Sequence, residues 1–497
     1  MNKETKVIII AVGAIALIGC LCVAVIGIGG LGLFIASSAT TGAPTADLLA
    51  ATPELPAVTV DPFDSGEGLP VATPTPTASS GVDEEVVPAE ATPDRSTSEI
   101  SPEIAAEMDE IEDQVVELRG LQPAGSVSRA LLTPAQLRQR VMDDFLEDYT
   151  LEEAQEDALI LSVFGLLDPD FELYDFYIEL FSEQISGYYD DETKEMYVIQ
   201  GEGFQGVERL TYAHEYTHAL QDQNFDFQDG LNYTDEACEE DSERCAAIQA
   251  LVEGDASLLE FEWFANFATA QDALEIQEFY SNYESPVYDS APAFLKEDFL
   301  FPYTYGQSFV EKLYAEGGWR AVDQAYRDLP VTTEQIIHPE KYPDDIPLQV
   351  PIEDLTGLLG DGWEEIDRGV MGEWYTYLIL ALGEDPSSRI DEDDAKEASA
   401  GWDGDTYLVY SNSAAGETAM VLAMQWETDE DVDQFFEAFL SYASNRFGTP
   451  ISQGADYSTW DDSNGFNTIY RDGLKTIWIA APDSESGTAI LNTLNGS

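Results

Sequence analysis

Three residues near the middle of the chain have the types and the spacing of a metal-binding centre. His214 and His218 are four positions apart, and Glu215 lies between them. On a helix, residues four positions apart are one turn apart, so both imidazoles can reach the same ion. His-Glu-x-x-His on a helix is typical of zinc hydrolases, in which the glutamate is the general base for the metal-bound water.

The stretch 206–223 has the periodicity of the helix that such a site needs. Apolar or small side chains recur every three or four positions, at Val207, Leu210, Ala213, Thr217 and Leu220, which is typical of one face of an amphipathic helix. The chain has 3 histidines, and two of them fall in this pattern. A chance match is expected in roughly one chain in several hundred. The alternative is two ordinary surface histidines on a core helix.

A zinc hydrolase needs a third protein ligand and one open position for water. Residues 246–265 predict a largely apolar helix with Glu253 and Asp255 in its middle, where an unpaired carboxylate is costly. Binding a cation removes that cost, so Glu253 is the expected third ligand; the alternative is a carboxylate on the helix surface. Gly254 is unfavourable inside a helix and fits a place where two helices approach closely.

With these two motifs the sequence resembles the gluzincin branch of zinc metallopeptidases, and specifically the peptidase-MA-like group. In that group HExxH is followed by a Glu-Gly-x-Ala ligand motif, and this chain has HEYTH from His214 and EGDA from Glu253. The resemblance implies a zincin-like catalytic domain with His214, His218 and Glu253 as zinc ligands and Glu215 as catalytic base. It covers residues 180–270 and extends more weakly to about 345.

One departure limits what the resemblance implies. Thermolysin-like enzymes have an asparagine directly before their third ligand, whereas this chain has Val252 there, so thermolysin's specificity is not carried over. Gluzincins usually place a tyrosine or histidine opposite the metal to stabilise the oxyanion. His338, Tyr303 and Tyr305 are therefore candidates for that role, although a histidine before a proline is more often a structural hydrogen-bonding residue.

The composition is strongly acidic, with 97 acidic against 21 basic residues and a formal net charge of −76. Such a charge repels nucleic acid and anionic membrane surfaces, so nucleic-acid binding is disfavoured. An acidic, well-solvated surface is the simplest interpretation. Calcium is compatible with it, but no stretch follows the twelve-residue calcium-loop pattern, so no calcium site can be placed.

The N-terminal part predicts a tether. Residues 7–36 carry no charge and are long enough for a membrane-spanning helix. Lys3 and Lys6 precede this run, so residues 1–6 are expected in the cytoplasm and everything after residue 36 outside the cell. The run continues well past Cys20, which argues against lipidation there without deciding it. Residues 37–100 are rich in Thr, Pro, Ser and Glu and predict a disordered stalk.

The catalytic domain is expected at 101–385, and it begins with helices. Ser101 with Pro102 is a helix start, as are Thr133 with the proline after it and the capping box at Thr150. Residues 183–199 then change to a strand period around a polar turn and predict a β-hairpin. Zinc peptidases commonly bind extended substrate along a strand at the cleft edge, so the hairpin is a candidate platform for β-addition, or else a plain sheet edge.

Further along the chain, Cys238 and Cys245 are expected to form a disulfide, since the chain is predicted to be outside the cell; the alternatives are a metal-binding pair or two free thiols. An acidic linker follows residue 385, and 386–497 predicts a small α/β lobe that either closes the cleft or binds a partner. Its strands are expected near 405–411, 417–426, 466–471 and 474–481, with a helix near 429–446.

Together these features predict an α+β protein: a membrane-anchored, extracellular zinc endopeptidase acting on polypeptides. Two alternatives stay open, a catalytically inactive binding or scaffold module on the same fold, and an aminopeptidase. The substrate, the cleavage preference and the oligomeric state are not predicted.

Overall fold

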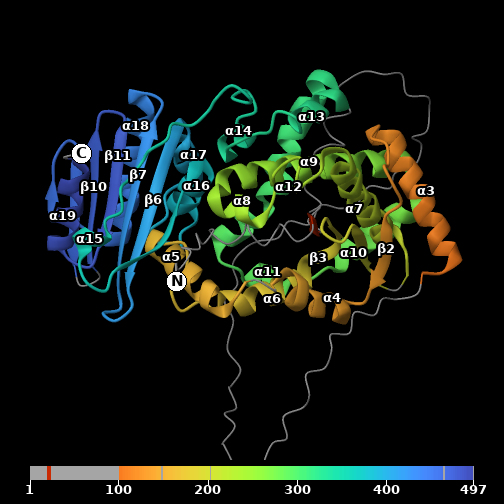
Figure 1. Ribbon diagram of the computed structural model, residues 1–497, viewed down its shortest axis with the longest axis horizontal. Coiled ribbons are helices and arrows are strands. Elements are labelled where there is room, and N and C mark those ends of the chain that lie inside the picture. The colour runs from red at the N-terminus through yellow and green to blue at the C-terminus, as the bar shows by residue number, and fades with distance from the viewer. Residues whose placement is uncertain (1–19, 24–99, 147–148, 202, 463–464, 496–497) are drawn as a thin grey trace, which may run out of the picture. The chain divides into compact units, whose positions relative to one another are not determined.

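The computed structural model is α+β, as the sequence predicts (Figure 1). It describes residues 100–146, 149–201, 203–462 and 465–495, together with the main chain of 20–23. The predicted stalk lies outside the described residues, apart from Ile100. Of the predicted membrane span only Cys20–Val23 is described, as strand β1, and the span stays a prediction. In the described part of the chain, no helix combines the length and the apolarity needed to cross a bilayer.

Capped helices open the described region where the sequence predicts them. The Ser101 hydroxyl accepts a hydrogen bond from the Ile104 amide, and Gly120 ends the first helix in the left-handed conformation. Capping boxes at Thr133 and Thr150 start the next two helices. The helical elements up to residue 184 have the bounds α3 Pro102–Arg119, α4 Pro134–Arg140, a π-helical turn at Val141–Phe145, α5 Leu151–Phe164 and α6 Leu173–Gln184.

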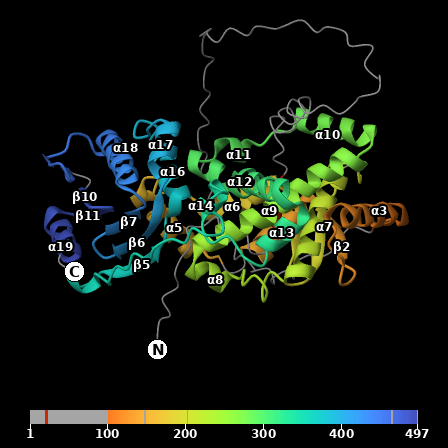
Figure 2. The same cartoon turned by 90° about the horizontal axis from the view of Figure 1, so that it is seen from above.

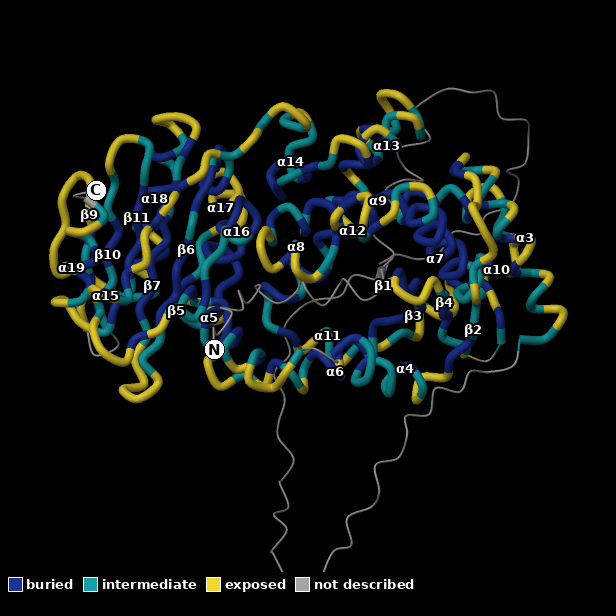
Figure 3. The backbone as a smooth tube through the Cα atoms, in the orientation of Figure 1, coloured by how far each residue is buried: buried dark blue, intermediate teal, exposed yellow. Residues whose placement is uncertain are grey.

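A small sheet lies against the helix that carries the two histidines. Its strand order is β1-β3-β4-β2, with β2 at Ser128–Leu132 parallel to β4, and β3 and β4 antiparallel. Strands β3 (Ile185–Asp190) and β4 (Glu195–Ile199) form the predicted hairpin. The main chain of β1 pairs antiparallel with the outer side of β3. The helix that follows, α7, spans Gly206–Phe225 and is buried from Leu210 to Asp222 (Figure 3).

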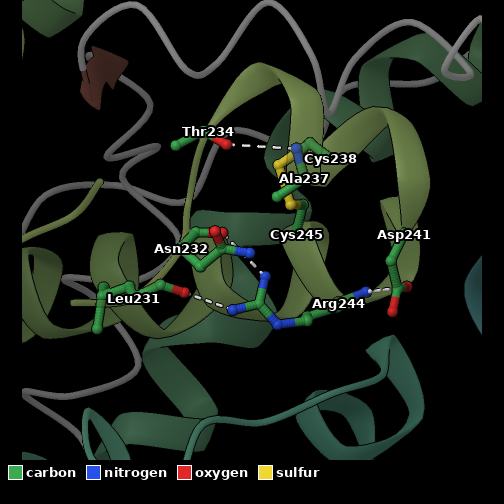
Figure 4. The surroundings of a disulfide bond; sticks show 8 residues. All are labelled: Leu231, Asn232, Thr234, Ala237, Cys238, Asp241, Arg244 and Cys245. Carbon is green, nitrogen blue, oxygen red and sulfur yellow. Dashed lines mark hydrogen bonds between the residues drawn. A yellow bond between two sulfur atoms is a disulfide. The ribbon is translucent and has the colours of Figure 1, made fainter. Parts of the chain in front are cut away.

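A disulfide fixes the connection between α7 and the next long helix (Figure 4). Cys238 in α8 (Asp235–Glu240) is bonded to Cys245 in α9 (Ser242–Phe267), which confirms the predicted pairing. Both cysteines are buried. Arg244 also donates to the main-chain oxygens of Leu231 and Asn232, so the start of α9 is tied to the loop before it.

Helix α9 crosses a second long helix, α12 (Ala293–Gly317), at two glycines. A β-carbon added to Gly254 would collide with the main-chain oxygen of Gly306, and one added to Gly306 would collide with that of Ala250. The close approach of two helices expected at Gly254 is therefore confirmed. The short helices around them have the bounds α10 Ala270–Asn282, α11 Pro286–Ser290, α13 Trp319–Ala325, α14 Thr333–Ile337 and α15 Thr356–Leu359.

The C-terminal part is a seven-stranded antiparallel sheet in the order β5-β6-β7-β11-β10-β9-β8. Both faces are covered, and Figure 2 shows α18 and α19 on opposite sides of β10 and β11. The predicted strands and the predicted helix are all present. The bounds are β5 Glu364–Gly369, α16 Gly372–Leu382, α17 Glu392–Ser399, β6 Trp402–Asn412, β7 Glu417–Trp426, α18 Asp429–Phe447, β8 Ser452–Gln453, β9 Tyr457–Asp462, β10 Gly465–Asp472, β11 Lys475–Ala481 and α19 Ser484–Asn495.

The sheet starts earlier in the chain than the boundary predicted at residue 386. Strand β5 at Glu364–Gly369 is its edge strand, and the acidic stretch read as a linker contains α17. Arg446 of α18 donates to the last main-chain oxygens of α5, including that of Phe164 at 2.9 Å, which have no partner inside a helix. One continuous apolar core includes residues of the helical part and of the sheet.

Buried carboxyl groups at this junction make stability depend on pH. Asp367 of β5 is 2 % exposed. Burial raises its pKa to about 7, although the Tyr407 hydroxyl, which donates to Asp367 at 2.7 Å, opposes that rise. Burial also raises the pKa of Asp157 in α5 well above its usual value. Well below pH 4 both carboxyls are protonated in the folded and the unfolded chain. As pH rises to 7 only the unfolded chain loses the proton of Asp367, so folding becomes less favourable.

We therefore expect Asp367→Asn to raise the free energy of unfolding at pH 8 relative to the parent chain and to change it little at pH 4. The upper limit of the gain is roughly 4 kcal/mol, the equivalent of a shift of about three pKa units. Urea unfolding at the two pH values measures it, with the exposed Asp394→Asn as control. An equal effect of Asp367→Asn at both pH values would contradict the expectation.

Candidate metal centre

The three predicted ligands come together between α7 and α9. His214, His218 and Glu253 each offer one ligand atom, and these atoms lie within 4.8 Å of one another. All three residues are buried, and the two imidazole centroids are 4.7 Å apart. The described part of the chain contains no second group of three such side chains, so the calcium compatible with the composition stays unplaced.

Distances within the group suit a small tetrahedral ion. Glu253 Oε2 lies 3.2 Å from His214 Nε2 and 3.5 Å from His218 Nε2. Ligand atoms 2.0–2.1 Å from a tetrahedral zinc ion lie about 3.3–3.4 Å apart. The same spacing also allows a hydrogen bond to a protonated imidazole. The chemistry of the set, two imidazoles and one carboxylate, is that of catalytic zinc sites, in which the fourth position is open.

The other nitrogen of each imidazole has its own partner, which fixes how the ring is turned. His214 Nδ1 lies 2.9 Å from Glu260 Oε2 on α9, and His218 Nδ1 lies 2.8 Å from Gln221 Oε1 on α7. Gln221 also donates to the main-chain oxygen of Val252 at 3.0 Å. Because both acceptors require a proton on Nδ1, the neutral rings present the lone pair of Nε2 toward Glu253, as metal-binding histidines do.

The electrostatics at this point favour a positive charge. Burial by itself lowers the pKa of His214, but hydrogen bonds to Glu253 and Glu260 outweigh it and raise that pKa to about 10. Burial raises the pKa of Glu253, yet the two histidines outweigh it and lower that pKa. Glu253 Oε1 and His218 Nε2 are buried and have no hydrogen-bond partner among the described residues. A divalent cation bound by His218 Nε2 and by both oxygens of Glu253 would satisfy both atoms, so the residues fit the ion that the sequence predicts.

Glu215 lies next to β3, which is the strand between β1 and β4 in the small sheet. It is fully buried on α7, and Gly187 of β3 packs against it. A β-carbon added to Gly187 would lie 2.7 Å from Thr211 Cγ2 and 3.1 Å from Glu215 Cγ. Only glycine allows the strand to lie this close to the helix, so β3 runs directly past the predicted base.

The candidates for an oxyanion donor lie on other elements. His338 follows α14 and places Nε2 2.9 Å from Glu373 Oε1 on α16, with Glu340 as its other ionic contact at 3.8 Å. Tyr303 and Tyr305 are on α12, where they pack against the apolar core. Tyr305 makes an edge contact with the ring of Trp374. The polar contacts of His338 are those of a structural histidine, and the catalytic role of all three residues stays a prediction.

Sequence reasoning missed three residues that shape the centre, namely Glu260, Gln221 and Gly187. Glu260 had a usable signal, because it lies two turns after Glu253 and so on the same face of α9. Gln221 lies three positions after His218 and had a similar signal. Gly187 had none, since its importance comes from a helix that follows it in the chain.

Comparison with known proteins adds a description of the C-terminal part alone. A domain family of unknown function, DUF8575, matches residues 359–491. This range holds the seven-stranded sheet with α16, α17 and α18, and it contains none of His214, His218 and Glu253. No curated protein and no solved structure matches the chain.

Proposed function

We propose that this chain is a zinc-dependent endopeptidase of the gluzincin type. The observation that supports it best is the convergence of His214 Nε2, His218 Nε2 and Glu253 Oε2 at 3.2 and 3.5 Å, with each Nδ1 engaged elsewhere. An intact Glu215 beside this group favours catalysis over a structural metal, because a structural site has no need of a base.

The residues around the group have separate tasks in peptide hydrolysis. His214, His218 and Glu253 would hold the zinc ion, which would act as a Lewis acid and lower the pKa of bound water toward neutrality. Glu215 would accept the proton of the attacking water. Glu260 and Gln221 keep the imidazoles of His214 and His218 turned toward the position of the ion. The donor to the oxyanion is proposed among His338, Tyr303 and Tyr305.

Strand β3 is the proposed platform for the polypeptide substrate. The edge of β3 that faces away from β4 pairs antiparallel with the main chain of β1, and an extended substrate would bind to this edge in place of β1. Gly187 brings the face of β3 against Glu215. Main-chain hydrogen bonds to β3 would therefore align a substrate with the base, whatever side chains the substrate carries.

The proposal includes a location outside the cell. Residues 7–36 would anchor the chain as a single membrane helix with 1–6 in the cytoplasm, and 37–100 would act as the stalk. The disulfide between Cys238 and Cys245 supports an oxidising compartment, because disulfides persist there and are rare in the cytosol.

Metal analysis of the purified full-length chain in detergent, combined with a cleavage assay, tests the function. We expect a single zinc ion per chain and cleavage of unfolded protein that a chelator stops and added zinc restores. N-blocked peptides should be cleaved as well as free ones, since an endopeptidase does not need a free amino terminus. Zinc binding without cleavage would identify a binding module, and cleavage of free peptides alone would identify an aminopeptidase.

A further inference from the structure

The residue two positions after the third ligand, Asp255, is held by an arginine from the first described helix. Arg119, the last residue of α3, donates from Nε and Nη2 to the two oxygens of Asp255 at 2.8 and 3.0 Å. Its Nη1 donates to Asp323 at 2.7 Å, and Tyr326 donates to Asp255 at 2.9 Å. The side chains of Arg119 and Asp255 are completely buried. The cation that offsets the cost of burying Asp255 is thus a guanidinium.

Three consecutive residues of α9 face three different neighbours. Successive residues of a helix are turned by about 100°, so Asp255 points about 200° away from Glu253. Glu253 faces the histidines of α7, Gly254 meets α12 at Gly306, and Asp255 meets Arg119. A planar guanidinium bound through two parallel hydrogen bonds fixes direction as well as distance. The contact with Arg119 therefore restrains the rotation of α9 about its axis.

We propose that Arg119 and Asp255 are a positioning pair that sets the rotation of α9 and thereby keeps Glu253 opposite His214 and His218. This inference rests on the proposed function of the metal group. The required precision is high, since a rotation of about 10° moves an atom 5–6 Å from a helix axis by about 1 Å. Metal sites tolerate deviations of about 0.2 Å in their ligand distances.

Asp255→Asn and Arg119→Lys test the pair, with Asp323→Asn as the matched control. Asp323 is the other carboxylate bound by the same guanidinium, but it is outside α9. Asparagine keeps the shape of Asp255 and loses its charge. Lysine keeps the charge of Arg119 and loses the planar guanidinium that donates two parallel hydrogen bonds. Zinc affinity, measured by competition with a chelator, should fall about 10–100-fold in Asp255→Asn and also fall in Arg119→Lys. It should stay near the parental value in the control.

A second measurement needs no zinc. The chain has 3 histidines, so the ring nitrogens of the metal-free protein can be assigned by long-range proton–nitrogen NMR. The His214 and His218 signals should shift in Asp255→Asn, in the same direction as in Glu253→Gln, and should keep their positions in Asp323→Asn. If Asp255→Asn does not fold, the same shifts of the His214 and His218 signals are measured in Arg119→Lys instead.

The two measurements separate this inference from the proposed function. If the parent chain binds no zinc, the proposed function fails, and the ring spectra still decide whether the pair positions Glu253. Unchanged histidine signals in Asp255→Asn would overturn the inference. It would also be overturned if Asp323→Asn weakened zinc binding as much as Asp255→Asn, because the effect would then reflect a general loosening of the fold.

Discussion

Replacing Glu215 with glutamine is expected to lower kcat for peptide hydrolysis about 10²–10⁴-fold, the range that general-base catalysis contributes. Glutamine keeps the shape of the side chain and cannot accept a proton. Zinc content should stay unchanged, because the ligand atoms belong to His214, His218 and Glu253. The measurement is kcat on an unfolded protein substrate together with metal analysis of the same preparation.

A substitution elsewhere separates the loss of the base from a general effect of removing a carboxylate. Glu278→Gln on α10 is exposed and should leave kcat unchanged. A Glu215→Gln variant that keeps the parental kcat with zinc bound would remove Glu215 from the mechanism. A variant that loses both zinc and activity would indicate instead that Glu215 is needed to form the site.

Gly254→Ala is expected to destabilise the fold, although alanine is usually the better helix residue. A β-carbon at this position would collide with the main chain of Gly306, and a main-chain obstacle cannot move aside as a side-chain tip can. Forcing extra volume into a packed contact costs roughly 1–3 kcal/mol, which exceeds the gain of roughly 0.5–1 kcal/mol from replacing a helical glycine. Because Glu253 is the adjacent residue, zinc affinity should fall as well.

Gly357→Ala in α15 is the control for helix propensity, since nothing lies within 4 Å of a β-carbon at that position. It should leave the free energy of unfolding equal or slightly higher, and Gly306→Ala should behave like Gly254→Ala. Urea unfolding of the three variants provides the comparison. Equal stability of Gly254→Ala and the parent chain would contradict the close crossing of α9 and α12.

Most elements could be predicted because their signals are local. Ser101, Thr133 and Thr150 cap helices through hydrogen bonds to amides three positions away, so the sequence contains both partners. The pattern of strand-forming residues predicted β6, β7, β10 and β11, because this pattern too lies within a short stretch of sequence. The start of the C-terminal sheet could not be predicted, because β5 is separated from its partner β6 by the two helices α16 and α17.

For the centre itself, the sequence determined the types of the candidate ligands, the candidate general base and the pairing of Cys238 with Cys245. A spacing of four on one helix forces His214 and His218 together whatever surrounds them. Only the tertiary structure decided which groups hold these ligands in place. Arg119 and Asp255 are 136 positions apart, and His214 and Glu260 are 46 apart. Contacts between residues so far apart in the sequence depend on how the helices pack, and helix packing depends on the whole core. No short stretch of sequence therefore predicts such contacts.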